Sequence, residues 1–367
     1  MKNLYKVLIL TLSVFPGLCS CSLTGEENDN PASELTIEVD NPLISADGES
    51  CAKLTVKQGG KDVTSEVTFY DAAKNVPVNL PDAKFSTTTP GKYSFWASYK
   101  AYISSSISVV AISAKVPEVP ADPQPESLDF SRKVLVTQFT GTACGFCPFM
   151  INILRKFAAE DSNKDKYVLA ACHTYTDSDP AFLSTNIDGA MGVTGYPSVV
   201  LDLNKSTKFS DYNSYTKFQS IFNAEYSKES AQAGISVATV LDGNQLVAKC
   251  SIKAAQSQEY RIAAWLLEDG IKANQANNGA EGDFSTHDNC VRLILGQNTS
   301  KDFTGTSCKL AKGETASQFI MMDVDPSWVK ENLHVIVFVC TNTRGSFMVN
   351  NVVDCPINSS VSYSYAN

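Results

Sequence analysis

The chain is 367 residues long, which predicts two or three domains rather than one. Hydrophobic residues make up 43% of it and charged residues 19%, a balance that excludes a disordered protein. The formal net charge is −9 and no cluster of lysines and arginines stands out, so we expect no nucleic-acid partner.

Residues 1–20 are typical of a bacterial signal peptide. A lysine-containing start precedes residues 7–15, an apolar run that is too short to span a bilayer. The run leads to Leu-Cys-Ser-Cys at 18–21, which resembles a lipobox, the cleavage and acylation motif of bacterial lipoproteins. The resemblance implies cleavage after residue 20, acylation of Cys21 and attachment to a membrane through the lipid. An ordinary signal peptide with incidental cysteines is the alternative.

Residues 21–33 form a polar, acidic tether. This segment resembles the acidic export signals that direct Bacteroidota lipoproteins to the cell surface. We therefore expect a protein of the cell envelope, an outer-membrane lipoprotein at either the periplasmic face or the cell surface.

Residues 34–114 are expected to form a β-sandwich. Apolar and polar residues alternate over short stretches such as 35–39 and 107–112, and turn signals such as Asp47-Gly48 separate them. The segment resembles bacterial immunoglobulin-like modules. A linker follows at residues 115–128, where four prolines fall among acidic residues and favour an extended connector.

Residues 129–232 change to alternating strands and helices. Strands are predicted at 134–139, 167–172 and 198–201 from their apolar runs. Helices are predicted around Met150, Leu154 and Phe157, and around Tyr215, Phe218 and Phe222, because these residues recur at helical spacing.

The segment Cys144-Gly145-Phe146-Cys147-Pro148 lies between the first predicted strand and the first predicted helix. A thiol at the amino end of a helix faces unsatisfied N–H groups, which favour the thiolate. Cys147, three residues after Cys144, can close a disulfide with it. A zinc site is not expected, because no second Cys-x-x-Cys or closely spaced pair of histidines exists in the sequence, and no cofactor is predicted.

Together with Thr194-Gly195-Tyr196-Pro197, which precedes the third strand, this order resembles the thioredoxin fold over about residues 131–230. The resemblance implies that Cys144 is the attacking thiolate and Cys147 the resolving thiol. It also implies that Phe146, Tyr196 and Pro197 contact the substrate, and that Pro197 is the cis-proline opposite the dithiol.

Two departures from the thioredoxin pattern leave an alternative open. Gln138 stands where thioredoxins carry a buried Asp that assists proton transfer, and Ala143 stands in place of the usual Trp. The pair Cys144–Cys147 could therefore be a structural disulfide in a fold that is used for binding.

Residues 233–367 are predicted to form a C-terminal β-sandwich, because apolar runs of strand length return and Asp242-Gly243 marks a hairpin. The whole order resembles Bacteroidota lipoproteins related to outer membrane protein twenty-eight, which join a thioredoxin-like domain to a C-terminal β domain. Of the remaining cysteines, Cys172, Cys250 and Cys340 lie in apolar strands and are expected to be buried.

The sequence thus predicts a multidomain protein with an immunoglobulin-like β-sandwich, a thioredoxin-like α/β fold and a C-terminal β-sandwich. The expected function is thiol–disulfide exchange with the thiols and disulfides of exported proteins, and the sequence identifies no redox partner. A non-enzymatic surface lipoprotein that uses the same fold for binding is the alternative.

Overall fold

The structure, a computed structural model, describes residues 8–10, 34–296, 299, 301–343 and 345–366. Apart from the short strand β1 (Leu8–Leu10), the predicted signal peptide lies outside the described residues, as do Cys21 and the acidic tether. The protein is multidomain and rich in β-strands, with 45% strand and 13% helix. It forms two compact units, the first of which is Met1–Glu118, Val240–Ala248 and Ser317–Asp323.

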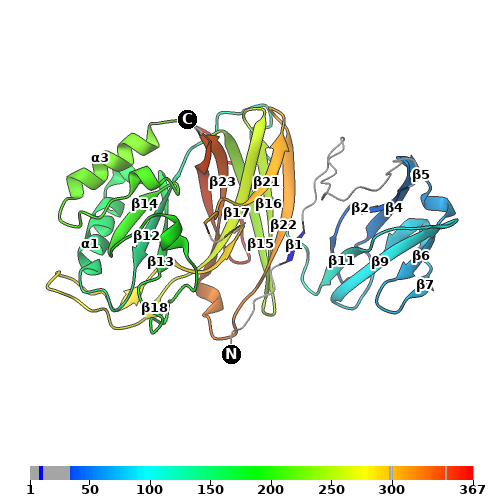
Figure 1. Cartoon of the computed structure of the whole chain (residues 1–367), viewed down its shortest axis with the longest axis horizontal. Helices are drawn as coiled ribbons and strands as arrows, with labels where there is room; N and C mark the ends of the chain where they lie inside the picture. Colours follow the sequence, from blue (N-terminus) through cyan, green and yellow to red (C-terminus); the bar gives the residue numbers. More distant parts are fainter. Residues whose placement is uncertain (1–7, 11–33, 297–298, 300, 344, 367) are drawn as a thin grey trace, which may run out of the picture. The chain divides into compact units, whose positions relative to one another are not determined.

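The first unit contains two sheets that share a core. One has the order β3-β11-β9-β6-β7 with β10 on β9, and the other has the order β2-β4-β5 with β8 on β4 (Figure 1). Leu54, Phe69 and Phe95 pack between them, so the alternation in the sequence does place one face of these strands in a core. The strands are β2 (Leu35–Val39), β3 (Leu43–Ser45), β4 (Ala52–Gln58), β5 (Lys61–Asp62), β6 (Thr68–Asp71), β7 (Val76–Val78), β8 (Lys84–Phe85), β9 (Gly91–Tyr99), β10 (Tyr102–Ile103) and β11 (Ile107–Ile112).

The second half of the predicted linker is held in place. The second unit begins at Val119. Lys253 Nζ lies 2.9 Å from Asp122 Oδ2, and the hydroxyl of Tyr365 donates to Asp122 Oδ1 at 2.6 Å. Asp122, which lies among the prolines, therefore anchors this stretch.

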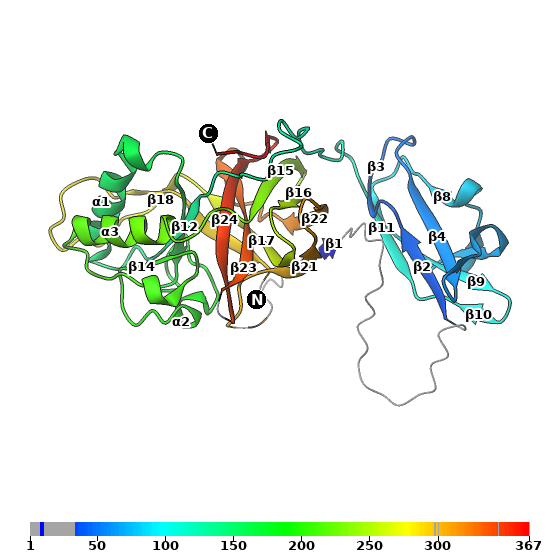
Figure 2. The same ribbon diagram turned by 90° about the horizontal axis from the view of Figure 1, so that it is seen from above.

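The strands and helices predicted between residues 134 and 226 are confirmed. They are β12 (Val134–Thr140), α1 (Cys147–Ala158), β13 (Tyr167–His173), α2 (Ile187–Ala190), β14 (Ser198–Leu201) and α3 (Tyr215–Tyr226), of which only the short α2 was not predicted. β12 pairs parallel with β13 and antiparallel with β14. Helices α1 and α3 cover one side of these strands, where Val136, Phe157 and Phe222 pack together (Figure 2).

Some of the strands after residue 232 continue the same sheet, and others form a second one. The order is β14-β12-β13-β20-β17-β23-β24, with β21 on β17, and Ala171 pairs with Cys290 where β13 meets β20. Another sheet has the order β1-β22-β16-β15-β25, and β18 pairs with β19. The strands are β15 (Ala233–Asp242), β16 (Gln245–Ala254), β17 (Gln258–Glu268), β18 (Ile271–Lys272), β19 (Thr286–His287), β20 (Cys290–Leu295), β21 (Thr306–Leu310), β22 (Thr315–Asp323), β23 (Leu333–Thr343), β24 (Ser346–Pro356) and β25 (Ser360–Val361).

A buried group that we call the Arg132 cluster joins β12, β14, α3 and β24. The Arg132 guanidinium donates to Asp202 Oδ2 at 2.6 Å and to the carbonyls of Glu225, Tyr226 and Asn350. Asp202 also accepts the Leu135 N–H at 2.8 Å. Since Arg132 and Asp202 are both buried, this network fixes the base of the sheet beneath the site.

Candidate dithiol site

The two cysteines of the Cys-x-x-Cys segment form a disulfide at the amino end of α1. Their Cα atoms are 5.4 Å apart. Two tight turns lead into the helix, because the Cys144 N–H donates to the Gly141 carbonyl at 3.0 Å and the Cys147 N–H to the Cys144 carbonyl at 3.2 Å. The helix begins at Cys147, so Cys144 lies in the turn before it.

A buried carboxylate holds the start of this loop. Asp179 accepts hydrogen bonds from the backbone N–H groups of Thr142 at 2.7 Å and Ala181 at 2.9 Å, and it contacts His173 Nδ1 at 2.8 Å. Burial alone would raise the pKa of Asp179, but these partners hold it well below its usual value. Asp179 could not be identified from the sequence, because nothing in its local pattern separates it from a solvent-exposed loop aspartate.

The same network extends to a free cysteine. His173 Nε2 lies 3.5 Å from the sulfur of Cys290, which is the first residue of β20. Burial raises the pKa of the Cys290 thiol well above its ordinary value, so Cys290 remains protonated and is not an activated nucleophile. The Cys290–His173–Asp179 chain therefore positions the loop rather than adding a second reactive thiol.

A segment from the C-terminal half lies against the dithiol loop. We call residues 273–280 the strap. The Ala276 N–H donates to the Thr142 carbonyl at 2.7 Å, and the Asn278 N–H donates to the Gly145 carbonyl at 2.9 Å. The Gln275 amide donates to the Cys144 carbonyl at 2.9 Å. Cys144 is only 4% exposed and Cys147 is fully buried, so in this state the sulfurs are covered.

The side chain of Asn278 in the strap lies close to the glycine between the cysteines. A Cβ atom at Gly145 would lie 2.6 Å from Oδ1 of Asn278. A larger residue there would require the end of the Asn278 side chain to move aside.

An aromatic surface lies beside the covered sulfurs. Phe146 is 46% exposed, and its ring stacks on Tyr212 with centroids 5.5 Å apart. Phe149 completes the group at 5.8 Å from Tyr212. An exposed aromatic group next to a dithiol offers apolar contact area to a bound polypeptide.

The Tyr196–Pro197 segment reaches the same edge of the sheet as the dithiol loop. β14 pairs antiparallel with β12, and Ser198 lies opposite Phe139, so Pro197 comes next to the end of β12. The Tyr196–Pro197 bond is cis. The Tyr196 hydroxyl donates to Asp188 at 2.7 Å and contacts the Thr174 hydroxyl at 2.9 Å, which fixes the ring.

Among the residues that the structure describes, the other cysteines do not pair. Cys172, Cys250 and Cys340 are buried, as predicted, and Cys290 and Cys308 are both free.

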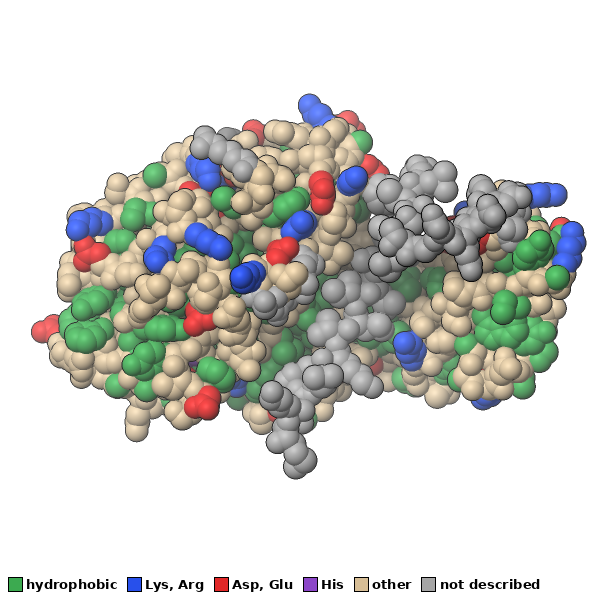
Figure 3. Space-filling model, viewed as in Figure 1, with side chains coloured by type: hydrophobic (Ala, Val, Ile, Leu, Met, Phe, Trp, Pro, Cys, Tyr) green, Lys and Arg blue, Asp and Glu red, His purple; other side chains and the backbone are tan. Residues whose placement is uncertain are grey.

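Over the described part of the chain, no group of three or more His, Cys, Asp or Glu residues could hold a metal ion. None of the described helices has the length and apolar character needed to cross a membrane. On the face shown in Figure 3, basic and acidic side chains are interspersed, so this face carries no patch of one charge.

Comparison with known proteins gives a family match and a structural match. Residues 185–361, just under half of the chain, match the model of a family described as outer membrane protein Omp28. The match includes Tyr196 and Pro197 but begins after the dithiol. No curated protein matches the sequence.

The second match is to a solved structure, HBP35 of Porphyromonas gingivalis, with a TM-score of 0.52 and 17% sequence identity. The similarity covers 65% of this chain and 78% of that chain, and it is a similarity of fold. The match to an outer membrane protein family supports the outer-membrane or cell-envelope location that the sequence predicts.

Proposed function

We propose that the Cys144–Cys147 pair exchanges disulfides with the thiols of other exported proteins, within a thioredoxin-like domain. The observation that carries this proposal is the position of the disulfide, at the amino end of α1 and at the sheet edge that Pro197 also reaches. The order β14-β12-β13 with α1 and α3 on one side supports the thioredoxin resemblance. The exposed ring of Phe146 supports contact with a polypeptide.

The exchange step moves two electrons. In the reduced protein, the Cys144 thiolate attacks one sulfur of a substrate disulfide and releases the other substrate sulfur as a thiolate. Cys147 then attacks the Cys144 sulfur of this mixed disulfide, which restores the Cys144–Cys147 bond and releases the second substrate thiol. The reverse sequence would oxidise a substrate dithiol.

The strap must move before either step. A substrate needs access to the sulfur of Cys144, which the folded loop and the strap leave almost completely covered. The covered state also supports the rival proposal, in which the disulfide is structural and the domain binds a partner without chemistry. The two proposals differ in whether the disulfide can be opened under mild conditions.

A trapping experiment separates the two. Cys147→Ser should accumulate mixed disulfides with envelope proteins that dithiothreitol releases, whereas Cys144→Ser should accumulate none, because only Cys144 attacks the substrate. The wild type should also equilibrate with a glutathione buffer at a potential above about −300 mV. If no adducts form and the potential lies well below that value, the exchange proposal is wrong and the disulfide is structural, in a domain that binds a partner.

A second pair of variants tests the role of the strap. Ala276→Pro removes the N–H that donates to Thr142, whereas Ala276→Ser retains it. We expect dithiothreitol to reduce the disulfide several-fold faster in the proline variant and at the wild-type rate in the serine variant. Equal rates in all three proteins would show that the strap does not limit access.

We also propose attachment to a membrane through a lipid on Cys21. Cys21→Ala should release the protein from membranes in fractionation, while Cys19→Ala should not. An acyl chain contributes about 0.8 kcal/mol per buried CH₂, so more than one chain gives firm anchoring. Retention of both variants in the membrane fraction would contradict the assignment.

A further inference from the structure

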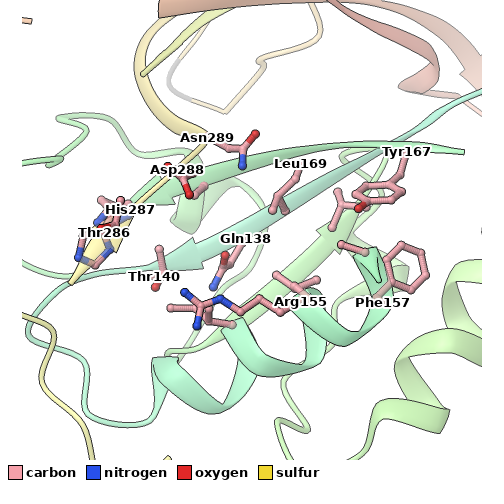
Figure 4. A pocket seen from close by; sticks show the side chains of 16 residues that line it. Gln138, Thr140, Arg155, Phe157, Tyr167, Leu169, Thr286, His287, Asp288 and Asn289 are labelled. Atoms are coloured by element: carbon pink, nitrogen blue, oxygen red, sulfur yellow. The ribbon is translucent and has the colours of Figure 1, made fainter. Parts of the chain in front are cut away.

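A cavity of about 160 Å³ lies on the helix side of β12 and β13, between α1 and residues 286–289 (Figure 4). It is separate from the sulfurs of the dithiol, and the inference drawn from it does not depend on thiol exchange. The two strands line it with every second residue, which are Val136, Gln138, Thr140, Tyr167, Leu169, Ala171 and His173.

The cavity is apolar at one end and polar at the other. Phe157 and Leu169 line the apolar end, whereas Gln138, Thr140 and Arg155 lie toward the polar one (Figure 4). The volume is close to that of the ~150 Å³ engineered cavities that hold benzene. It therefore suits a small molecule with an apolar body and one polar group.

Two buried side chains at the polar end lack partners. Gln138 is 4% exposed and Thr140 is 3% exposed. Within the described part of the chain, neither Nε2 of Gln138 nor Oγ1 of Thr140 has a hydrogen-bond partner. Such groups are costly to bury, and both atoms can donate. An acceptor placed in the cavity would satisfy both atoms.

Arg155 adds a positive charge to the same space. Figure 4 shows its guanidinium and the Gln138 amide pointing toward one another from α1 and β12. The guanidinium lies 5.0 Å from the ring of Phe284, and it forms no ion pair at salt-bridge distance among the described residues. Two groups of donors that converge without an acceptor favour an anionic ligand.

The nearby acidic groups are already engaged by other donors. Asp288 accepts the Gly270 N–H at 2.8 Å, and Asp283 accepts the Ser285 N–H at 2.9 Å. Hydrogen bonds from Ser285, with smaller contributions that include Arg155, lower the pKa of Asp283. Asp179 is saturated by the dithiol loop and His173, as described above. Burial lowers the pKa of His287, so this ring adds no positive charge at neutral pH.

We infer that this cavity binds a small carboxylic acid with an apolar body, of about the size of benzoate. The carboxylate would accept hydrogen bonds from Gln138, Thr140 and Arg155, and the apolar body would pack on Phe157 and Leu169. The chemistry of the donors selects a carboxylate over a neutral molecule of the same shape.

Calorimetric titration of the full-length protein with sodium benzoate at neutral pH tests this inference, with benzamide as the neutral isostere. We expect saturable binding of benzoate and at least tenfold weaker binding of benzamide. Arg155→Met and Gln138→Leu should each weaken benzoate binding at least tenfold. Lys156→Met is the matched control, because Lys156 is the neighbouring exposed cation on α1 and its amine lies over the ring of Tyr215 instead.

Circular dichroism and thermal unfolding of each variant show whether it is folded before its affinity is compared. The surface variant Arg155→Met keeps the test valid if Gln138→Leu misfolds. Absence of benzoate binding, equal binding of benzamide, or unchanged affinity in Arg155→Met would each overturn the inference.

Discussion

The buried polar groups at the two ends of β12 differ in whether they have hydrogen-bond partners. At its start, Arg132 donates to Asp202 and to three backbone carbonyls, and Asp202 accepts a further N–H from Leu135. At its end, Gln138 and Thr140 are equally buried, yet Gln138 Nε2 and Thr140 Oγ1 have no partner among the described residues.

The contrast between the two ends of β12 indicates which buried polar groups stabilise the fold. A network in which each donor meets an acceptor stabilises the packing of strands and helices, and removing one member leaves a charge buried without its partner. A buried amide without a partner costs free energy and suggests a role outside folding. Substitutions at the two ends should therefore change stability in opposite directions.

The largest effect is expected at the Arg132 cluster. Arg132→Met should lower the free energy of unfolding by about 3–5 kcal/mol, because the Asp202 carboxylate would remain buried without its cation. Urea denaturation measures this loss. Lys217→Met, which breaks the exposed ion pair with Asp211, is the control and should not change stability within error. A loss in Arg132→Met as small as that of the control would show that the cluster does not hold the sheet.

A second, pH-dependent effect is expected at His334. Burial alone would lower the pKa of His334, but Asp269 and Asp354 raise it to about 9. Nδ1 lies 2.7 Å from Asp354, and Nε2 lies 3.4 Å from Asp269. Because the folded state binds this proton more tightly, its contribution is complete below about pH 6.5 and disappears as the pH rises through about 9.

His334→Gln should therefore destabilise the protein by about 2 kcal/mol near pH 6, and by much less above about pH 9.5. Because the two carboxylates are exposed to solvent, the expected loss of stability is smaller than that for a fully buried ion pair. Urea denaturation at both pH values measures the difference. A loss that is independent of pH would mean that packing, rather than charge, accounts for the role of His334.

A smaller effect of opposite sign is expected at Gln138. Gln138→Leu should raise the free energy of unfolding by about 1 kcal/mol, since it replaces an unsatisfied buried amide with an apolar side chain of similar size. Denaturation in the absence of added carboxylic acids measures this gain. A loss of stability would instead mean that the Gln138 amide is hydrogen-bonded in the native protein. The two ends of β12 would then not differ in the way described above.

The smallest effect on stability is expected at Phe146, which is 46% exposed. Phe146→Ala should change the free energy of unfolding by no more than about 0.5 kcal/mol, because little packing is lost. Under the proposed exchange function, Phe146→Ala should nevertheless slow the reaction with a protein disulfide more than the reaction with glutathione disulfide. Glutathione disulfide is too small to cover the aromatic surface. Equal slowing with both would argue against a polypeptide contact.

Much of the architecture around the site could be predicted from local patterns. Residues 134–139 read as a buried strand, and the recurrence of Met150, Leu154 and Phe157 predicted a helix, because period and polarity are properties of neighbouring residues. The helix after the dithiol begins at Cys147 rather than at Cys144, with Pro148 in its first turn, where proline is tolerated. The spacing of the two cysteines allowed the disulfide that the structure shows.

Only the tertiary structure decided which distant residues complete the site. The strap is more than 100 residues from Cys144 in the chain, and two of its contacts are made by backbone N–H groups that carry no sequence signal. Asp179 acquires its role from burial beside Thr142 and His173, which its own neighbours do not encode. The pairing of Ala171 with Cys290 likewise merges two regions into one sheet through a long-range register. Local periodicity determined where strands and helices form, whereas burial and long-range backbone pairing determined what covers the dithiol and which polar atoms are left without partners.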